Sequence, residues 1–469
     1  MNRYRYLLRN VGLLTLSSFA TKILSFFLVP LYTSLLTTSE YGTYDLFNTT
    51  IGVLLPIITL NIQESVLRFS IDSKFSRKSI VTISTRYLLY SNLLVIAFLT
   101  INGLLGLSPL VNEYALFFFL MYLSQSLSGI LTMYVRGIDN IKELSISSVL
   151  ASALTIVLNV VFLAVFNWGL SGYFLANIIG IILQCIYLIY KVEVLNSIRL
   201  REKFEVEKAA MINYSRPLIA NSIAWWVNNA SDRYIVILFY GLAENGIYSV
   251  ASKIPSILNI FQTIFNQAWT LSAVRDFDPE DRDNFFSNTY RVYNCLMVVT
   301  CSVIIASDKI LAKFLYANDF YVAWQYVPWL TIAILFGAIS GYIGGFFAAV
   351  KDSKIFATST VFGAITNIIL NFCLVPYIGT LGAAIATAIS YFEVWAFRYW
   401  HSQKYIKLKI NLFRDCISYS ILILQSLVLL FLKQENLLYT VEFGLLLIIV
   451  ILYGNDILLL LTSKKRDRK

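Results

Sequence analysis

Residues 144–166 read LSISSVLASALTIVLNVVFLAVF, and no charged side chain occurs anywhere in this run. A helix of about 20 predominantly apolar residues is long enough to cross the hydrocarbon core of a bilayer. Comparable apolar runs, such as residues 93–107 and 178–190, recur along the whole chain. The sequence therefore predicts an all-α membrane protein with no separate soluble domain.

The composition supports this interpretation. Hydrophobic residues make up 58% of the chain and charged residues 14%, whereas soluble proteins carry about 25% charged residues. The net charge of +10 lies mainly in short segments between apolar runs, which argues against a nucleic-acid partner. The five cysteines lie in or beside apolar runs without CxxC spacing, so we expect inert thiols rather than disulfides or metal ligands.

The apolar runs predict about fourteen transmembrane helices. Their expected limits are 11–36, 43–67, 80–104, 113–135, 144–167, 170–190, 213–240, 246–272, 285–306, 321–349, 355–377, 381–403, 411–432 and 437–461.

The distribution of lysine and arginine sets the expected orientation, because cytoplasmic loops are enriched in both. An N-terminus in the cytoplasm places 26 of the 37 Lys and Arg residues in inside segments. The outside segments then hold only Lys309, Lys313 and Lys433. We therefore expect a multi-pass protein of the inner (cytoplasmic) cell membrane with both termini in the cytoplasm.

Two pairs of similar motifs indicate an internal repeat. Residues 40–44 (EYGTY) match residues 244–248 (ENGIY) at an offset of 204, and residues 169–176 (GLSGYFLA) match 379–386 (GTLGAAIA) at an offset of 210. Two matches at nearly one offset predict two six-helix lobes related by a pseudo-twofold axis along the membrane normal. Chance similarity of short glycine-containing turns is the alternative.

The repeat leads to a division of the chain into four parts. We expect an N-terminal six-helix lobe over residues 1–191, a cytoplasmic linker over 192–212 and a C-terminal six-helix lobe over 213–404. Residues 405–469 would form two additional, lipid-facing helices and a basic cytoplasmic tail. In transporters built from such repeats the substrate site lies between the halves.

Polar residues follow helical spacing inside several predicted spans. In the eighth span they step by 3 and 4 along one continuous helix face, beside Lys253: Ser249, Ser252, Ser256, Asn259, Thr263, Asn266 and Thr270. A similar row in the first span contains Thr15, Ser18, Lys22 and Ser25. Such faces are unfavourable against lipid tails, so they predict either a hydrated cavity or hydrogen bonds between helices in a dry bundle.

Charged residues inside the spans point to an anionic ligand. Lys22 lies eleven residues into its span, about 16 Å deep at 1.5 Å per residue. Charges at such depths are costly and are a functional hypothesis by default. We expect Arg216 and Arg398 to reach the membrane interface instead, by snorkelling. The remaining interior cations outnumber the acids, and arginine in particular suits phosphate.

These considerations give a set of candidate substrate-binding residues: Lys22, Arg233, Lys253, Arg291, Asn229, Asn259 and Asn266. Four tryptophans are suited to stacking on sugar rings: Trp225, Trp226, Trp269 and Trp395.

The deepest acids, Asp232 and Glu393, are the candidate sites for H⁺ or Na⁺ coupling. The alternative is that Asp232 neutralises a nearby cation and orders the helices. The sequence contains no Walker A motif, no GxSxG and no HExxH, and its only histidine is His401. We therefore expect a transporter rather than an enzyme, with no cofactor and no metal site.

Several short motifs resemble those of a known family, and their order and spacing extend over nearly the whole chain. They are Gly12-Leu-Leu, residues 22–30 (KILSFFLVP), 40–45 (EYGTYD), 231–235 (SDRYI) and 246–254 (GIYSVASKI). The sequence resembles the flippases for lipid-linked oligosaccharide repeat units, of the O-antigen and capsule type, in the multidrug/oligosaccharidyl-lipid/polysaccharide exporter superfamily.

The resemblance implies two six-helix lobes, two extra helices and alternating access. It also implies a polyprenyl-diphosphate-linked glycan as substrate, moved to the outer leaflet for surface polysaccharide synthesis. Membrane lipids, a polysaccharide polymerase and other assembly proteins would be its partners. The alternatives are a lipid II flippase, an ion-coupled multidrug antiporter with a net acidic interior, and a membrane polymerase or ligase with a large catalytic external loop.

Overall fold

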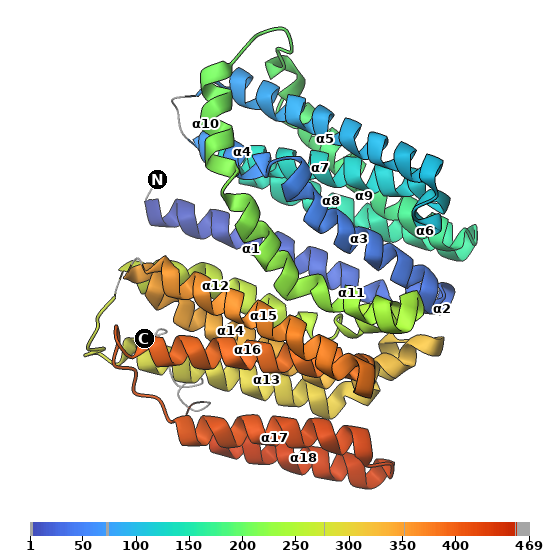
Figure 1. The fold of residues 1–469 in the computed structure, drawn as a ribbon. Helices are drawn as coiled ribbons and strands as arrows, with labels where there is room; N and C mark the ends of the chain where they lie inside the picture. Colours follow the sequence, from blue (N-terminus) through green and yellow to red (C-terminus); the bar gives the residue numbers. More distant parts are fainter. Residues whose placement is uncertain (1–2, 72–74, 276, 351, 455, 457–469) are drawn as a thin grey trace. The chain divides into compact units, whose positions relative to one another are not determined.

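A computed structural model describes residues 3–71, 75–275, 277–350, 352–454 and 456, and every regular element in these ranges is a helix (Figure 1). The chain forms two compact units, Met1–Ala230 and Ser231–Lys469. Their boundary falls inside one helix, α11 (Leu218–Ala251), whose first residues belong to the first unit.

The first unit contains ten α-helices before α11, together with a π-helical end to α8 (η1) and one 3₁₀ turn (η2). Their bounds are α1 Arg3–Phe27, α2 Val29–Leu35, α3 Thr38–Ile58, α4 Ile62–Ile71, α5 Arg77–Leu105, α6 Pro109–Glu113, α7 Ala115–Gly137, α8 Ile141–Asn159, η1 Val160–Val165, α9 Gly169–Lys191, η2 Val194–Ser197 and α10 Glu205–Ser215.

The second unit contains the rest of α11, seven further helices and one 3₁₀ segment. Their bounds are α12 Ser256–Arg275, α13 Phe285–Leu315, η3 Asn318–Gln325, α14 Val327–Ala349, α15 Ser353–Ile378, α16 Thr380–Ser402, α17 Leu412–Phe431 and α18 Glu435–Leu452.

The described helices confirm the all-α transmembrane fold. Twelve are long and apolar enough to cross a membrane, and a thirteenth span results if α3 and α4, bent by 61°, are taken together. The helix α12, part of the predicted eighth span, is not among them. Its polar residues, including Asn259 and Asn266, lower its hydropathy below that of the other spans.

The predicted eighth span is wrong in one respect, because residues 246–272 are not one continuous helix. Helix α11 ends at Ala251, a turn follows, and α12 begins at Ser256. Pro255 explains the break, since proline has no N–H to donate and its ring clashes with the carbonyl of the preceding turn. The backbone N–H of Lys253 bonds instead to Val250 O at 2.9 Å, three residues back. The polar residues from 249 to 270 therefore lie on two helices rather than on one helix face.

The second pair of repeat motifs has the same local structure in both units. Gly169 and Gly379 adopt positive φ angles of 51° and 68° at the starts of α9 and α16. Three residues later, a Cβ on Gly172 would lie 3.2 Å from Phe162 O, and one on Gly382 would lie 2.7 Å from the carbonyl carbon of Leu374. Both glycines therefore permit close packing against the preceding helix. The pseudo-twofold axis and the four-part division of the chain stay predictions.

Each unit has its own core. In the first, Phe47, Tyr122 and Phe174 from α3, α7 and α9 belong to one buried hydrophobic cluster. In the second, the fully buried Tyr342 of α14 stacks on Trp269 of α12, with ring centroids 4.0 Å apart, and meets Phe346 edge-on.

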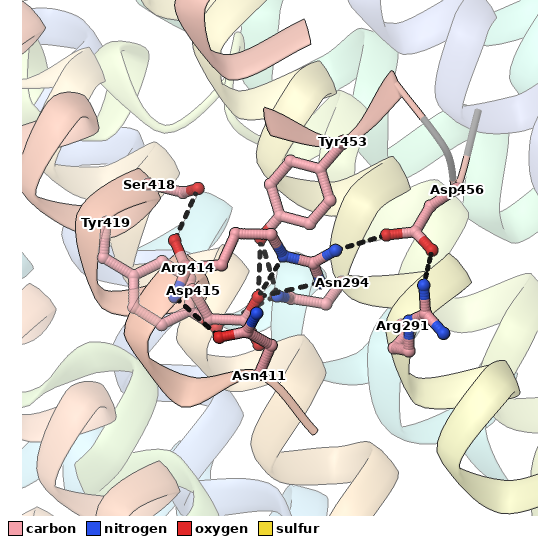
Figure 2. A network of polar contacts seen from close by, with 9 residues as sticks. All are labelled: Arg291, Asn294, Asn411, Arg414, Asp415, Ser418, Tyr419, Tyr453 and Asp456. Atoms are coloured by element: carbon pink, nitrogen blue, oxygen red, sulfur yellow. Dashed lines mark hydrogen bonds and ion pairs between the residues drawn. The ribbon is translucent and has the colours of Figure 1, made fainter. Parts of the chain in front are cut away.

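A charged cluster holds α17 and the end of α18 against α13 (Figure 2). Asp456 binds Arg291 of α13 through Oδ1 at 2.6 Å and Arg414 of α17 through Oδ2 at 2.5 Å. Arg414 also pairs with Asp415 at 3.1 Å. Both aspartate side chains are only 1% exposed, so each negative charge depends on its arginine partners for compensation.

Hydrogen bonds from uncharged side chains extend this charged cluster between the helices. Tyr453 donates to Asp415 Oδ1 at 3.0 Å, and Asn294 of α13 donates to the Tyr453 oxygen at 3.0 Å (Figure 2). Tyr419 donates in turn to Asn294 Oδ1. The other sides of α17 and α18 are apolar and exposed, as at Phe431 and Ile451. The two C-terminal helices thus combine an exposed apolar side with a polar attachment to α13, and their contact with lipid stays a prediction.

We predict that Asp456→Ala lowers the free energy of unfolding by about 2–3 kcal/mol. This is slightly less than the value for breaking a fully buried pair, because Arg291 is one-third exposed. Thermal unfolding in detergent measures the loss. The matched control is Glu280→Ala, which removes an exposed pair with Lys407 and should cost about 1 kcal/mol or less. Equal effects of the two substitutions would contradict a stabilising role for the cluster.

Candidate functional site

Lys22 lies on an exposed polar row of α1. The side chains of Ser18, Lys22 and Ser25 are all exposed, and their spacing of four and three residues places them on one side of the helix. Helix α1 packs along α8. Among the described residues, no carboxylate lies within ion-pair distance of Lys22. The ammonium therefore has no internal counter-charge in this part of the chain.

The first residues of α11 are held by polar contacts to α3 and to the bend between α3 and α4, within the first unit. Asn61 donates to Ser222 Oγ at 3.1 Å, and Trp226 Nε1 donates to the carbonyl of Thr49 at 2.8 Å. Trp225, at 47% exposure, and Asn229 point away from this packing. The polar and aromatic residues near the start of α11 therefore divide into packed ones, Ser222 and Trp226, and accessible ones, Trp225 and Asn229.

In the second unit, Asp232 of α11 is 8% exposed and accepts a hydrogen bond from Tyr248 at 2.6 Å. These residues are sixteen positions apart, which would be about 24 Å along a continuous helix. The contact is possible because α11 is broken at Gly241, whose φ of 84° and ψ of −175° lie in a region that only glycine adopts readily. The break turns the chain so that Tyr248 meets Asp232.

Residues of α15 and α16 complete what we call the Asp232 cluster. Thr387 Oγ1 donates to Asp232 at 3.5 Å, and Asn367 donates to Thr387 at 3.2 Å and to Ser390 at 3.3 Å. Asn371 donates to the Asn367 carbonyl. The Asp232 carboxylate thus contacts two hydroxyl groups, those of Tyr248 and Thr387, and oxygen ligands of this kind are the ones that hard cations prefer. Among the described residues no three His, Cys, Asp or Glu side chains converge.

Two further candidate cations of the second unit, Arg233 and Lys253, lie on α11 and in the turn that follows it. Arg233 follows Asp232 on α11, and Lys253 lies in the turn that Pro255 creates; both side chains are half-buried and make contacts within the protein. Asn266 of α12 packs against Gly341 of α14, where a Cβ would lie 3.4 Å from its Nδ2.

Two asparagines of α12 are less exposed than two of its apolar residues. Asn259 and Asn266 are half-buried, whereas Phe261 and Ile264 are 41% and 39% exposed. Ser249, at the end of α11, is 1% exposed. The polar side of this segment therefore packs within the second unit, and the hydrated cavity stays a prediction.

The structure places Arg291 and Glu393 apart from these contacts. Arg291 is engaged by Asp456 in the charged cluster of α13, α17 and α18. Glu393 is half-buried on α16, and its Oε2 accepts no hydrogen bond from the described residues. No described contact joins either residue to Arg233, Lys253 or Asp232.

The predicted snorkelling of Arg398 is wrong. Its side chain is 5% exposed, and its guanidinium donates to Ser359 Oγ, the Ser340 carbonyl and Thr360 Oγ1 at 2.9–3.1 Å. It also stacks on the ring of Phe356. Arg398 therefore joins α14, α15 and α16 and does not reach an interface. Arg216, by contrast, is exposed, as expected.

Two of the four tryptophans predicted to stack on sugars are not accessible. Trp269 and Trp395 are each 4% exposed, and Trp269 Nε1 donates to the Tyr342 carbonyl at 2.8 Å. Both rings pack in aromatic clusters of the second unit. Trp225 is the most exposed of the four and remains a candidate.

Sequence reasoning missed the partners of Asp232. Asn367 and Asn371 recur at a spacing of four in an apolar span, a pattern that could have identified them. The sequence singled out Tyr248 only as a member of the repeat motif at residues 244–248. Its contact with Asp232 depends on the backbone at Gly241, which no spacing rule specifies.

The family model described as "Polysaccharide biosynthesis protein" matches residues 7–271 of this chain. A curated relative from Haloferax volcanii, named "Probable low-salt glycan biosynthesis flippase Agl15", is 24% identical over 188 residues. The matched region spans 39% of this chain and 39% of that relative.

Solved structures share the fold over most of the chain. A lipid II flippase, MurJ, in an inward closed conformation has a TM-score of 0.70 and 14% identity, covering 94% of this chain and 99% of its own. An inward-facing multidrug resistance MATE family transporter of the MOP superfamily has a TM-score of 0.65 and 13% identity, covering 87% and 95%. At such identities these similarities establish the fold of a multi-pass membrane protein and no more.

We predict that Arg398→Lys lowers the free energy of unfolding by about 2–4 kcal/mol, because a lysine ammonium cannot reproduce the fork of the guanidinium and leaves buried acceptors unpaired. Arg216→Lys is the control at an exposed position and should change little. Thermal unfolding of both variants in detergent provides the comparison. A loss of stability from Arg216→Lys as large as that from Arg398→Lys would be inconsistent with the buried role.

Proposed function

Because this chain belongs to the polysaccharide biosynthesis protein family, we propose that it is a flippase for a glycan carried on a polyprenyl diphosphate. Its substrate is an undecaprenyl-diphosphate-linked oligosaccharide repeat unit. The protein moves this unit from the cytoplasmic to the outer leaflet of the cell membrane by alternating access, for surface polysaccharide synthesis. In this proposal both termini lie in the cytoplasm.

The observation that carries the proposal is the accessible, uncompensated Lys22. A lysine at the centre of a membrane helix costs about 2.5–3.5 kcal/mol on insertion scales. In this chain no described carboxylate offsets that cost. A diphosphate supplies the missing negative charge and several strong hydrogen-bond acceptors. The exposed hydroxyls of Ser18 and Ser25 on the same side of α1 add donors for phosphate oxygens.

The other candidate residues form two groups, one suited to binding the head group and one suited to binding the sugars. Arg233 and Lys253 add positive charge in the second unit. Asn229 and Trp225 are exposed near the start of α11 and offer an amide and an aromatic face, the two groups that sugar hydroxyls and ring faces engage. We assign Asn259 and Asn266 to the polar lining of the same proposed substrate site.

Arg291 is the weakest member of the set, since its guanidinium already binds Asp456. A substrate phosphate would have to compete with that carboxylate. We therefore expect the head group to depend on Lys22, Arg233 and Lys253 far more than on Arg291.

For energy coupling we propose the Asp232 cluster. A buried carboxylate that contacts the hydroxyls of Tyr248 and Thr387 can take up H⁺ or Na⁺. It can release the ion when the helices rearrange, because α11 is broken at Gly241, between Asp232 and Tyr248. Glu393, which lies on α16 as Thr387 does, is the second candidate for the coupling site. Pulling by polymerisation of the product is the alternative energy source.

Our first functional prediction is that Lys22→Ala abolishes export at a normal protein level. The test is complementation of a deletion strain, with lipid-linked repeat units quantified in each leaflet. Units should accumulate on the inner leaflet. Lys78→Ala, at an exposed position on α5, is the control and should support full export. Normal polymer output from Lys22→Ala would refute a substrate role for Lys22.

The same assay separates the alternatives. A lipid II flippase would leave the surface polysaccharide intact and instead block peptidoglycan synthesis when deleted. A multidrug antiporter would alter resistance to cationic drugs with no accumulation of either lipid intermediate.

Our second functional prediction concerns coupling. Asp232→Asn or Glu393→Gln should abolish gradient-driven flipping in vesicles with an imposed pH or Na⁺ gradient, while downhill flipping persists. Tyr248→Phe keeps the Asp232 carboxylate but removes its 2.6 Å donor, so it should shift the ion dependence without abolishing coupling. If both acid variants retain full gradient-driven transport, neither carboxylate is the coupling site.

A further inference from the structure

A basic pocket lies beside the first half of α5, in the first unit. It has a volume of about 310 Å³ and forms between α5 and the segment that leads from η2 into α10. Its charged lining residues are Arg86, Arg201, Lys203, Glu205 and Lys208, accompanied by Tyr87 and Tyr90. No residue of this pocket belongs to the candidate substrate or coupling sites.

Specific hydrogen bonds hold the pocket together. Thr82 Oγ1 accepts from the backbone N–H of Arg199 at 2.9 Å. One turn further along α5, the Arg86 guanidinium donates to the carbonyl of Leu200 at 2.8 Å and to that of Glu202. The linker segment is therefore fixed against α5, and the Arg86 side chain is held in place by backbone rather than by a carboxylate.

The charges of the pocket are unbalanced. Four cationic side chains face a single carboxylate, Glu205, which pairs with Lys208 at 3.3 Å. In the described part of the chain, no carboxylate forms an ion pair with Arg86, Arg201 or Lys203. The pocket is thus suited to an anion with several oxygen acceptors, such as a phosphate group.

The position of the pocket relative to the apolar surface of α5 indicates where that phosphate comes from. Tyr90, Leu93, Ile101 and Leu104 are exposed by 50–81% and continue the Arg86 side of the helix at spacings of three, four or their sums. Arg86 and Leu104 are separated by about 27 Å along the helix, close to the thickness of the hydrocarbon core. Arg86 therefore lies at the depth of the lipid head groups, with an exposed apolar strip beside it for the acyl chains.

We propose that this pocket binds the phosphate head group of an anionic membrane lipid in the cytoplasmic leaflet. The guanidinium of Arg86 and the ammonium groups of Lys203 and Lys208 contact the phosphate, and Tyr90 packs on the glycerol and upper acyl chain. Basic pockets at the cytoplasmic ends of transmembrane helices are established sites for acidic head groups. The side of the membrane follows the proposed orientation, but the site does not depend on which glycan the protein carries.

The bound lipid would stabilise the linker. Residues 192–204 connect α9 and α10. The four cations of the pocket come from this linker, from the start of α10 and from α5, and they repel one another when the pocket is empty. An anionic head group removes this repulsion and bridges the linker to α5. Binding should therefore raise the thermal stability of the protein as well as retain the lipid.

The test measures binding of phosphatidylglycerol to the purified full-length protein by native mass spectrometry and by thermal shift. Arg86→Gln/Lys203→Gln should weaken binding about 25-fold, at about fivefold per charge. The matched control is Arg77→Gln/Lys78→Gln, which removes the same charge from exposed positions of α5 outside the pocket and should change binding less than threefold. Unfolding temperatures without lipid confirm that both variants are folded.

Further arms identify the source of the phosphate. Phosphatidylethanolamine should bind at least tenfold more weakly than phosphatidylglycerol, and inorganic pyrophosphate should not displace the lipid at equal concentration. Equal binding by the two double variants, or tighter binding of pyrophosphate than of the lipid, would overturn the proposal.

Discussion

Hydrocarbon does not solvate ions, so each charge inside this chain must be compensated by the protein, by water or by a ligand. This constraint separates the interior charges into two groups. The protein itself compensates Asp456 through Arg291 and Arg414, and disperses the charge of Arg398 over Ser359, Thr360 and a carbonyl. These groups fix helices to one another. The exposed Lys22 has no such partner among the described residues, which is why it carries the functional proposal.

The break in α11 at Gly241 has a comparable influence on the second unit. It allows Tyr248 to return to Asp232, so that a carboxylate within an apolar span accepts a hydrogen bond from a hydroxyl sixteen residues away. Together with the turn at Pro255, it also divides the segment from Leu218 to Arg275 into three short helical pieces. Short pieces joined by glycine and proline can change their relative angles more easily than one long helix, as alternating access requires.

The sequence was sufficient for the features that depend on local patterns. Hydropathy predicted the helices, and the second motif pair led to glycines with matching roles at the starts of α9 and α16. Features that depend on tertiary contacts were not predictable in this way. The burial of Arg398, the pairing of Arg291 with Asp456 and the packing of Trp269 and Trp395 each involve partners far away in sequence. Pro255 could have predicted the helix break, but the regular spacing of the polar residues indicated one continuous helix.

The difference between Lys22 and its neighbours also bears on selectivity. A lysine ammonium is a compact charge that donates to any nearby phosphate oxygen and has little sensitivity to what the phosphate carries. Every polyprenyl-diphosphate-linked glycan presents the same diphosphate, so cationic residues alone cannot distinguish one glycan from another. Discrimination between sugars requires protein groups that hydrogen-bond to the sugar hydroxyls and stack on the ring faces. An incorrect sugar is rejected because it leaves a buried polar group without a hydrogen-bond partner. In this chain Trp225 and Asn229 have that chemistry and are accessible, so the glycan preference should follow these side chains while the ability to flip follows Lys22.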